Sequence, residues 1–170
     1  MTNTVDEYWM KQAITQAQAA SEAGEVPVGA VVVVPSARAD RQITNEAVGH
    51  LGKMISEAHN QPISAHDPSA HAELLALRLA AQTQENYRLP EATIYTTLEP
   101  CLMCAGAMVH ARVRRLVYGA SEPKAGVVES HPILGASWLN HRLEVTGGVL
   151  AEQCGQLLTD FFKEARQHAK

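Results

Sequence analysis

The sequence predicts an α/β protein with a three-layer α/β/α sandwich, in which helices cover both faces of a sheet. Short runs rich in β-branched residues alternate along the chain with longer runs in which apolar residues recur at helical spacing. Of the 170 residues, 46% are hydrophobic and 19% are charged, which is typical of an ordered globular domain. A chain of this length can bury one sizeable core, so we expect a single domain over residues 1–170.

The first part of the chain predicts a helix followed by two strands. In residues 6–23 the apolar positions, among them Trp9 and Met10, recur every three or four residues and form one stripe. Residues 26–34 are apolar on both faces, as expected of a central strand that is covered on each side. A second strand is predicted within residues 55–63, where it ends in a turn.

The rest of the chain predicts three helices and three strands. Asp67-Pro68-Ser69 supplies capping and turn residues before an alanine- and leucine-rich helix at residues 70–81. A strand at 92–97 is followed by a helix at 101–113 and a strand at 115–119. A last strand at 143–146 precedes an amphipathic helix at 151–170.

Four residues with metal and proton chemistry lie at two of these helix starts: His71, Glu73, Cys101 and Cys104. One nitrogen and two thiolate ligands suit tetrahedral zinc and leave a fourth position for water, which is a catalytic arrangement. Glu73 is a better candidate for moving the protons of that water than for a fourth ligand. Because side chains in a first helical turn lean toward the helix start, two helix N-termini that meet would place all four groups around one ion.

Each half of this motif also has an ordinary explanation. A lone C-x-x-C is typical of a redox pair or of half a structural zinc site, and a lone H-x-E is common by chance. The structural alternative is two buried cysteines and a histidine that is satisfied in the core. The presence of both halves, in this order and each at a helix start, favours the metal site. Cys154, the third cysteine, is predicted to be a small buried thiol on the last helix.

The charge distribution bears on possible partners. A net charge of −4 is unusual for a protein that binds nucleic acid, but residues 112–170 carry 8 basic and 6 acidic groups. The grouping of Arg112, Arg114 and Arg115 favours a phosphate-contacting edge, although any single one of them fits an ordinary solvated surface equally well. No apolar run approaches the roughly 20 residues that a membrane span requires, and the first residues do not form a signal peptide. We therefore expect no membrane contact and a cytoplasmic location.

Three segments resemble the bacterial tRNA-specific adenosine deaminases, which belong to the cytidine deaminase-like superfamily of zinc deaminases. They are residues 25–31 (EVPVGAV), 66–73 (HDPSAHAE) and 98–108 (LEPCLMCAGAM). The likeness runs from about Tyr8 to Phe162. It implies a cytidine deaminase-like fold with a mixed sheet of about five strands, one Zn²⁺ per subunit on the two cysteines and the histidine, and a homodimer whose sites are partly built from both chains.

The resemblance also implies a reaction and a substrate: hydrolytic deamination of adenosine to inosine at the wobble position of a tRNA anticodon, with Glu73 as the catalytic residue. Four residues are implied in substrate binding, namely Asn60, Val28, Ala72 and Pro100. Asn60 matches an asparagine whose amide offers the donor and acceptor that a purine edge requires, and its structural alternative is an asparagine that holds a turn. Val28 and Gly29 lie where the family's strand passes beneath the base, and a glycine permits close backbone approach.

Two other functions remain open at this point. A free-base or nucleoside deaminase acting on guanine or cytosine would share the metal ligands and the glutamate. A non-catalytic zinc-bearing subunit of an RNA-editing complex would be expected to lack the proton-moving glutamate, and this chain has Glu73.

The chain departs from the family in one segment, which we interpret as an inserted loop at about residues 35–54. The family usually turns between its first two strands within a few residues, so this connection is long. It is either an exposed flap that modulates RNA access or dimer contacts, or an insertion that is tolerated because lengthening a surface loop costs little.

Overall fold

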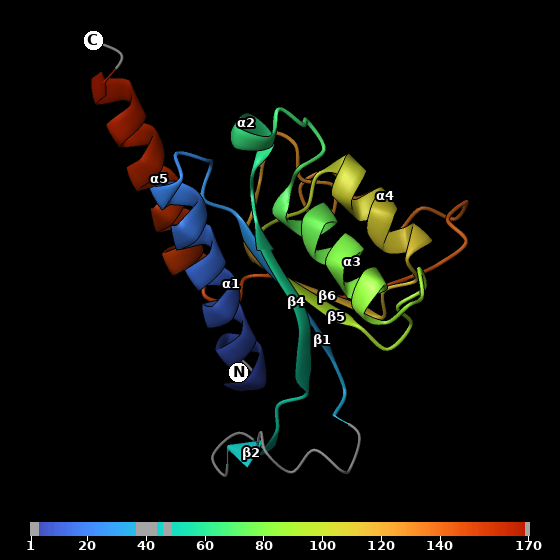
Figure 1. Ribbon diagram of the computed structural model, residues 1–170. Helices are drawn as coiled ribbons and strands as arrows, with labels where there is room; N and C mark the ends of the chain where they lie inside the picture. The colour runs from blue at the N-terminus through green and yellow to red at the C-terminus, as the bar shows by residue number, and fades with distance from the viewer. Residues whose placement is uncertain (1–3, 37–43, 46–48, 169–170) are drawn as a thin grey trace.

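The computed structural model describes residues 4–36, 44–45 and 49–168, and it has a five-stranded sheet with helices on both faces (Figure 1). The strands of the sheet lie in the order β4 (Lys53–His59), β1 (Gly29–Val34), β5 (Thr93–Leu98), β6 (Arg115–Ala120) and β7 (Glu144–Thr146). The helices are α1 (Thr4–Glu22), α2 (Pro62–Ala65), α3 (Ala72–Thr83), α4 (Leu102–His110) and α5 (Ala151–His168). The three-layer α/β/α prediction is confirmed.

The sheet is mixed, and its strand directions bring three strand ends to one edge. Strand β1 pairs antiparallel with both β4 and β5, while β5, β6 and β7 are parallel to one another. Strands β4 and β5 therefore run in the same direction. The register places His59 opposite Gly29, and Leu98 opposite Ala120. The C-terminal ends of β4, β5 and β6 consequently share one edge of the sheet, which we call the site edge.

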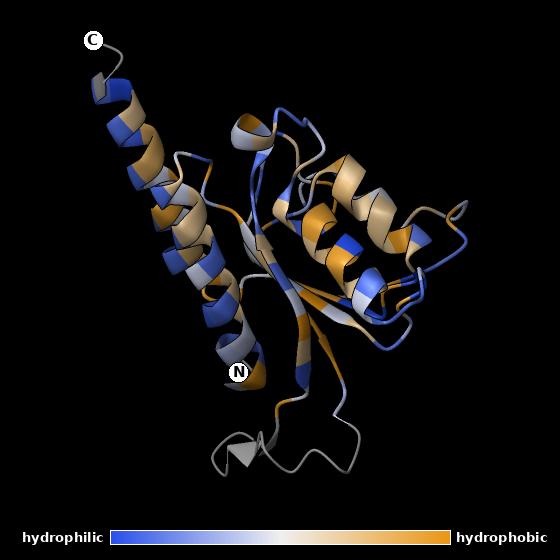
Figure 2. Cartoon of the chain, viewed as in Figure 1, coloured by the Kyte–Doolittle hydropathy of each residue, from blue (hydrophilic) through white to orange (hydrophobic). Residues whose placement is uncertain are grey.

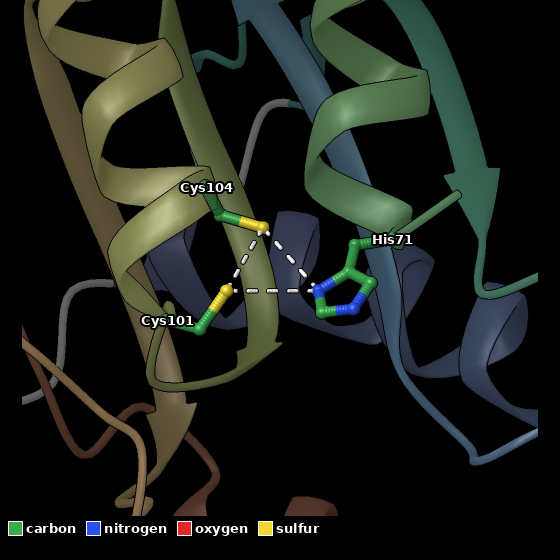
Figure 3. Close-up of side chains that lie close together, drawn as sticks. All are labelled: His71, Cys101 and Cys104. Atoms are coloured by element: carbon green, nitrogen blue, oxygen red, sulfur yellow. Dashed lines mark hydrogen bonds between the residues drawn. The ribbon is translucent and has the colours of Figure 1, made fainter. Parts of the chain in front are cut away.

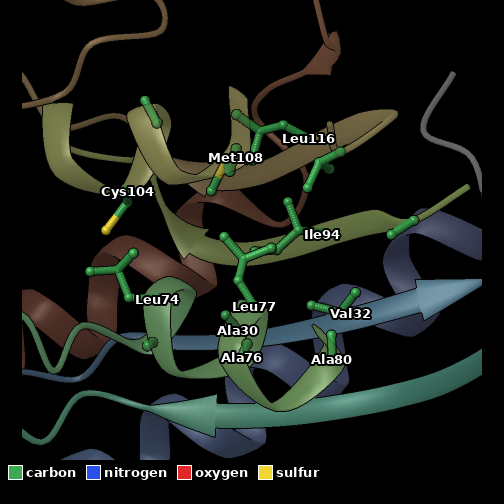
Figure 4. Packing of buried hydrophobic residues seen from close by; sticks show 14 of the residues in the cluster. Ala30, Val32, Leu74, Ala76, Leu77, Ala80, Ile94, Cys104, Met108 and Leu116 are labelled. Carbon is green, nitrogen blue, oxygen red and sulfur yellow. The ribbon is translucent and has the colours of Figure 1, made fainter. Parts of the chain in front are cut away.

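A hydrophobic core lies between the sheet and helices α3 and α4 (Figure 4). Its buried members include Val32 of β1, Ile94 of β5, Leu116 of β6, Leu77 of α3 and Met108 of α4. Figure 2 shows hydrophobic residues along these strands and on α3. Because Cys104 belongs to the same buried cluster, one candidate metal ligand is part of the core.

A second core lies on the opposite face, between the sheet and helices α1 and α5. It contains Trp9 and Met10 of α1, Val31 of β1 and Cys154 of α5. Alternate residues of β1 thus enter the two cores, which explains why this strand is apolar on both faces. The prediction that Cys154 is a buried thiol on the last helix is confirmed.

Gly29 has a different role from the one the resemblance suggested. A Cβ on this residue would lie 2.1 Å from the backbone oxygen of Ala13 and 2.4 Å from the nitrogen of Ala17, both in α1. The missing side chain therefore faces α1, on the face of the sheet opposite α3 and α4. The glycine permits close helix-on-strand packing, and the expectation that it makes room for a base is wrong.

The predicted inserted loop at 35–54 lies in part outside the described residues. The described portion contains the short antiparallel strands β2 (Thr44–Asn45) and β3 (Gly49–His50). Leu51 is buried, and its carbonyl oxygen accepts a hydrogen bond from Trp9 Nε1 at 2.7 Å. The end of the segment is therefore bound to the second core, and β4 begins at Lys53.

Within the described residues, no helix is both long enough and apolar enough to cross a bilayer.

Candidate active site

The histidine and two cysteines lie at the starts of two helices on the site edge. His71 is the N-cap of α3 and Cys101 is the N-cap of α4, both with extended backbone (φ −75°, ψ 146° and φ −76°, ψ 172°). The prediction placed His71 inside the first turn, and the structure moves it one position back. Its carbonyl already accepts the first helical hydrogen bond, from Leu75 N at 3.0 Å.

The three candidate ligand atoms form a nearly equilateral triangle (Figure 3). His71 Nδ1 lies 3.7 Å from Cys101 Sγ and 3.6 Å from Cys104 Sγ, and the two sulfurs are 3.6 Å apart. Ligands about 2.1–2.3 Å from a tetrahedral zinc ion would be separated by about 3.6–3.8 Å. The triangle therefore fits a single Zn²⁺, and its donor set of one imidazole nitrogen and two sulfurs suits that ion.

Glu73 lies two residues beyond His71, in the first turn of α3, and is 3% exposed. Its Oε2 is buried and has no hydrogen-bond partner among the described residues. Buried carboxylate oxygens are rarely left unpaired in folded proteins. The carboxylate interacts with the Cys104 side chain, so Glu73 lies beside the candidate metal ligands.

The site groups strongly affect one another's protonation in the absence of a metal. The hydrogen bond between the Cys101 and Cys104 sulfurs, assisted by that with His71, lowers the pKa of the Cys101 thiol to about 4. The same sulfur–sulfur interaction raises the pKa of Cys104, and the hydrogen bond with Cys101 raises the pKa of His71. Burial raises the pKa of Glu73. A thiolate beside an imidazole is the form in which these groups bind a divalent cation.

Asn60 supplies the cap of α3, which corrects the expectation that Asp67-Pro68-Ser69 would do so. The side-chain Oδ1 of Asn60 accepts a hydrogen bond from Ala72 N at 2.9 Å. The backbone N–H of Asn60 donates to Val28 O at 3.0 Å. Asp67 instead accepts from the backbone and hydroxyl of Ser69 within the loop. Because Oδ1 already accepts one hydrogen bond, the Nδ2 group is the more available part of the Asn60 amide for a ligand.

The other three residues implied in substrate binding are buried around the same point. Val28 and Ala72 belong to the core cluster that contains Cys104, and Pro100 directly precedes Cys101. The backbone N–H of Ala72 is already bonded to Asn60, so it is not free to bind a substrate. The Pro100 carbonyl accepts from Val127 N at 3.0 Å.

Two buried carboxylates near the site were not identified from the sequence. Glu25 accepts from the backbone N–H groups of Ile63 and Ser64, at 3.2 and 2.7 Å, and so holds the start of α2. Glu99 follows β5 and binds the loop after β6. The available signal was a single acidic residue directly after the apolar run at 93–98.

Both carboxyl groups have a pKa below the ordinary value. Burial alone would raise the pKa of Glu99, but hydrogen bonds from Ser130 and from the backbone of Glu122 and Glu129 lower it to about 2. Burial likewise opposes the hydrogen bonds from Ser64 and Ile63 at Glu25, and the hydrogen bonds prevail, so its pKa is below the ordinary value.

The clustered arginines lie near the start of β6, at the end of the sheet opposite the site edge. Arg115 begins β6, at the end of the sheet opposite the site edge, and its guanidinium binds Asp6 through two 2.8 Å contacts. Arg112 donates to Asn140. Because β6 is six residues long, its start at Arg115 lies roughly 17 Å from its end at Ala120 on the site edge.

The sequence of the chain is similar to that of known deaminases. The family model of MafB19-like deaminases matches residues 4–166. The chain is 45% identical over 166 residues to the tRNA-specific adenosine deaminase of Haemophilus influenzae, with 97% of this chain and 87% of that protein covered.

Solved structures with the same fold include enzymes that act on purines. One, from a study of A-to-I editing by tRNA:A34 deaminases at the wobble position of transfer RNA, has a TM-score of 0.77 and 36% identity, and the match covers 89% of this chain and 99% of that one. The guanine deaminase from Nitrosomonas europaea has a TM-score of 0.68 and 25% identity, with 91% and 83% covered. The likeness in both sequence and fold is greater for the tRNA-acting protein.

Proposed function

The chain belongs to the MafB19-like deaminase family, and on that premise we propose that it converts adenosine to inosine by hydrolysis at the wobble position of a tRNA anticodon. The observation that carries the proposal is the triangle of His71 Nδ1 and the sulfurs of Cys101 and Cys104 beside the buried Glu73 carboxylate. Water is consumed and ammonia is released, so the reaction needs no redox partner.

The proposed cofactor is one Zn²⁺ per chain, held by His71, Cys101 and Cys104. A Zn²⁺ ion bound there would supply the nucleophilic form of water at neutral pH, because coordination lowers the pKa of water toward 7. The two helix N-termini that carry the ligands place positive dipole ends beside the thiolates and so stabilise their charge.

Glu73 is the proposed proton carrier. It accepts a proton from the attacking water, delivers it to N1 of adenine, and so makes C6 more electrophilic. It then takes the proton of the new hydroxyl group on C6 and passes it to the amino group, which leaves as ammonia, so that C6 becomes a carbonyl and N1 keeps its proton. The unpaired Oε2 supports this role, since no neighbouring donor competes for that oxygen among the described residues.

Asn60 is proposed to bind the base through its Nδ2 group. With Oδ1 bonded to Ala72 N, the amide is oriented to donate through Nδ2, and a purine ring nitrogen such as N7 is a suitable acceptor. Val28, Ala72 and Pro100 are proposed to form apolar walls beside the base.

A tRNA anticodon is the proposed substrate because its loop presents unpaired nucleotides. Removing a base from a single-stranded loop costs less than removing it from a duplex. The support from the relatives is their activity on tRNA, which is named for both the Haemophilus influenzae protein and the structure with the TM-score of 0.77. With tRNA as the substrate, the proposed place of action is the cytoplasm.

We further propose that the chain acts as a homodimer in which the outer face of α4 meets a second copy. Leu102 is 60% exposed and Met103 39% exposed on this face, and Gly106 has free space where a Cβ would be. A Gly106→Arg variant fits the free chain but would block close approach of a partner. We expect light scattering to give a dimer for wild type and for a Glu164→Arg control on α5, and a monomer for Gly106→Arg.

The function is tested with purified protein and an RNA anticodon stem-loop that carries adenosine at the wobble position. Mass spectrometry should detect inosine in the RNA, with guanine, cytosine and free adenosine left unchanged. Turnover of free guanine or cytosine in place of the stem-loop would instead establish the free-base alternative. Zinc without turnover on any of these substrates would support a non-catalytic subunit.

A further inference from the structure

The loop between β6 and β7 is organised around a single carboxylate, that of Glu99, which is 2% exposed. Glu99 Oε1 accepts hydrogen bonds from the backbone N–H groups of Val128, Glu129 and Ser130, at 3.1, 2.8 and 2.9 Å. Its Oε2 accepts from Glu122 N at 2.9 Å and from the Ser130 hydroxyl at 2.6 Å. Four backbone donors of one loop thus depend on one side chain.

The loop also closes directly around this carboxylate. A Cβ on Gly126 would lie 2.4 Å from Glu99 Cδ, so the backbone at this position can approach the carboxylate only because it is a glycine. Gly126 is also bridged to Cys101, and Val127 N donates to Pro100 O at 3.0 Å. The loop is therefore attached to the same three consecutive residues that lead into the candidate metal site.

The outer surface of this loop faces solvent at the site edge. Ser121, Pro123, Lys124 and Ala125 are exposed, and they follow the C-terminal end of β6, which pairs with the end of β5. Lys124 is one of the basic groups of the C-terminal third of the chain. Unlike Arg115, it lies at the site edge of the sheet. An RNA that places a base at Glu73 would pass this surface with its flanking phosphates.

We propose that Glu99 is a positioning residue that holds residues 121–131 in the conformation that contacts the RNA on either side of the target adenosine. This inference rests on the proposed function. Glu99 touches no reacting atom, because both of its oxygens are bonded to the loop. Its contribution is to keep the loop in its binding-competent form, and the apparent Kd rises by the factor by which that population falls.

The test compares Glu99→Gln with Asp6→Asn, which alters a second buried carboxylate that has several donors and lies in α1, at the end of the sheet opposite the site edge. In Glu99→Gln an NH₂ group replaces one oxygen, so at least one backbone N–H of the loop loses its acceptor. Ser130→Ala, which removes one hydrogen bond, is the milder variant if Glu99→Gln does not fold. For each protein, one measures hydrogen exchange of peptides covering 121–131, zinc content, stem-loop Kd and kcat at saturating RNA.

We expect Glu99→Gln to lose exchange protection in the loop and to bind the stem-loop about tenfold more weakly, with about one zinc per chain and kcat within about twofold of wild type. Ser130→Ala should change in the same direction by a smaller factor. Asp6→Asn should lose stability but keep loop protection and Kd.

An unchanged Kd in Glu99→Gln despite a loosened loop would overturn the inference. An equal rise in the Kd of Asp6→Asn would overturn it as well. A wild-type protein that does not act on the stem-loop would instead overturn the proposed function, and the exchange measurement would still report whether Glu99 anchors the loop.

Discussion

Replacing Arg115 by alanine should destabilise the protein without weakening RNA binding. The guanidinium makes two 2.8 Å contacts with Asp6 and one 2.8 Å contact with Thr146 Oγ1, and Asp6 also accepts from the Tyr95 hydroxyl at 3.1 Å. These bonds join the start of α1 to strands β5, β6 and β7. Among the side chains that the structure describes, the substitution would leave the buried Asp6 carboxylate with one donor, the tyrosine hydroxyl.

The expected magnitude follows from the burial of the two partners. Breaking a fully buried ion pair on one side costs about 3–5 kcal/mol. The Asp6 side chain is 3% exposed but that of Arg115 is 24% exposed, so solvent screens part of the interaction and we expect about 2–3 kcal/mol. For a chain of this size each kcal/mol lowers Tm by about 2–4 °C, which gives a decrease of about 4–12 °C.

The matched control is Arg114→Ala, which removes the same charge from the adjacent residue. Arg114 is exposed and lies 3.9 Å from the exposed Glu144, so its loss should change stability by at most about 0.5 kcal/mol. Thermal unfolding and stem-loop binding are measured for both variants. A normal Tm for Arg115→Ala together with weaker RNA binding would refute the reasoning and restore the clustered arginines as a phosphate-contacting edge.

Three further substitutions test single contacts. Gly29→Ala forces a Cβ against the Ala13 backbone and should cost about 3 kcal/mol or more in urea unfolding, whereas a wild-type midpoint would show that α1 can shift. Asn60→Asp keeps the acceptor that caps α3 but loses Nδ2, so stability should stay near wild type while KM for the stem-loop rises about tenfold; an unchanged KM removes Asn60 from base binding. The pKa of Glu25 in the folded protein lies below 4.5, so its ionised form adds stability above pH 4.5 that is lost as the pH falls further. Glu25→Gln should therefore be less stable than wild type at pH 7 and progressively closer to it below pH 4.5, and a constant difference from pH 7 to pH 3 would contradict this.

The grouping of the three candidate metal ligands was predictable because much of its signal is local. A histidine and two cysteines at helix starts can be recognised from spacing and from the turn residues beside them. The alternation of apolar runs likewise predicted the layers of the fold. In each case the property depends on neighbours within one or two helical turns.

The residues that orient the site were less predictable because their partners are distant in sequence. Asn60 caps a helix that begins twelve residues later, and Glu99 binds donors 23 to 31 residues away. Arg115 looked available for phosphate because its partner, Asp6, lies 109 residues earlier. Only the topology of the sheet shows that this arginine and the site lie at opposite strand ends.

The central proposal is that His71, Cys101 and Cys104 bind zinc while Glu73 moves protons. It is tested most directly by measuring zinc content and turnover together in Glu73→Ala. We expect about one zinc per chain, as in wild type, and a loss of stem-loop deamination of at least about 10²-fold. His71→Ala, measured in parallel, should lose the metal as well as the activity. Loss of zinc from Glu73→Ala would make this carboxylate a ligand, and retained turnover would show that the protons move by another route.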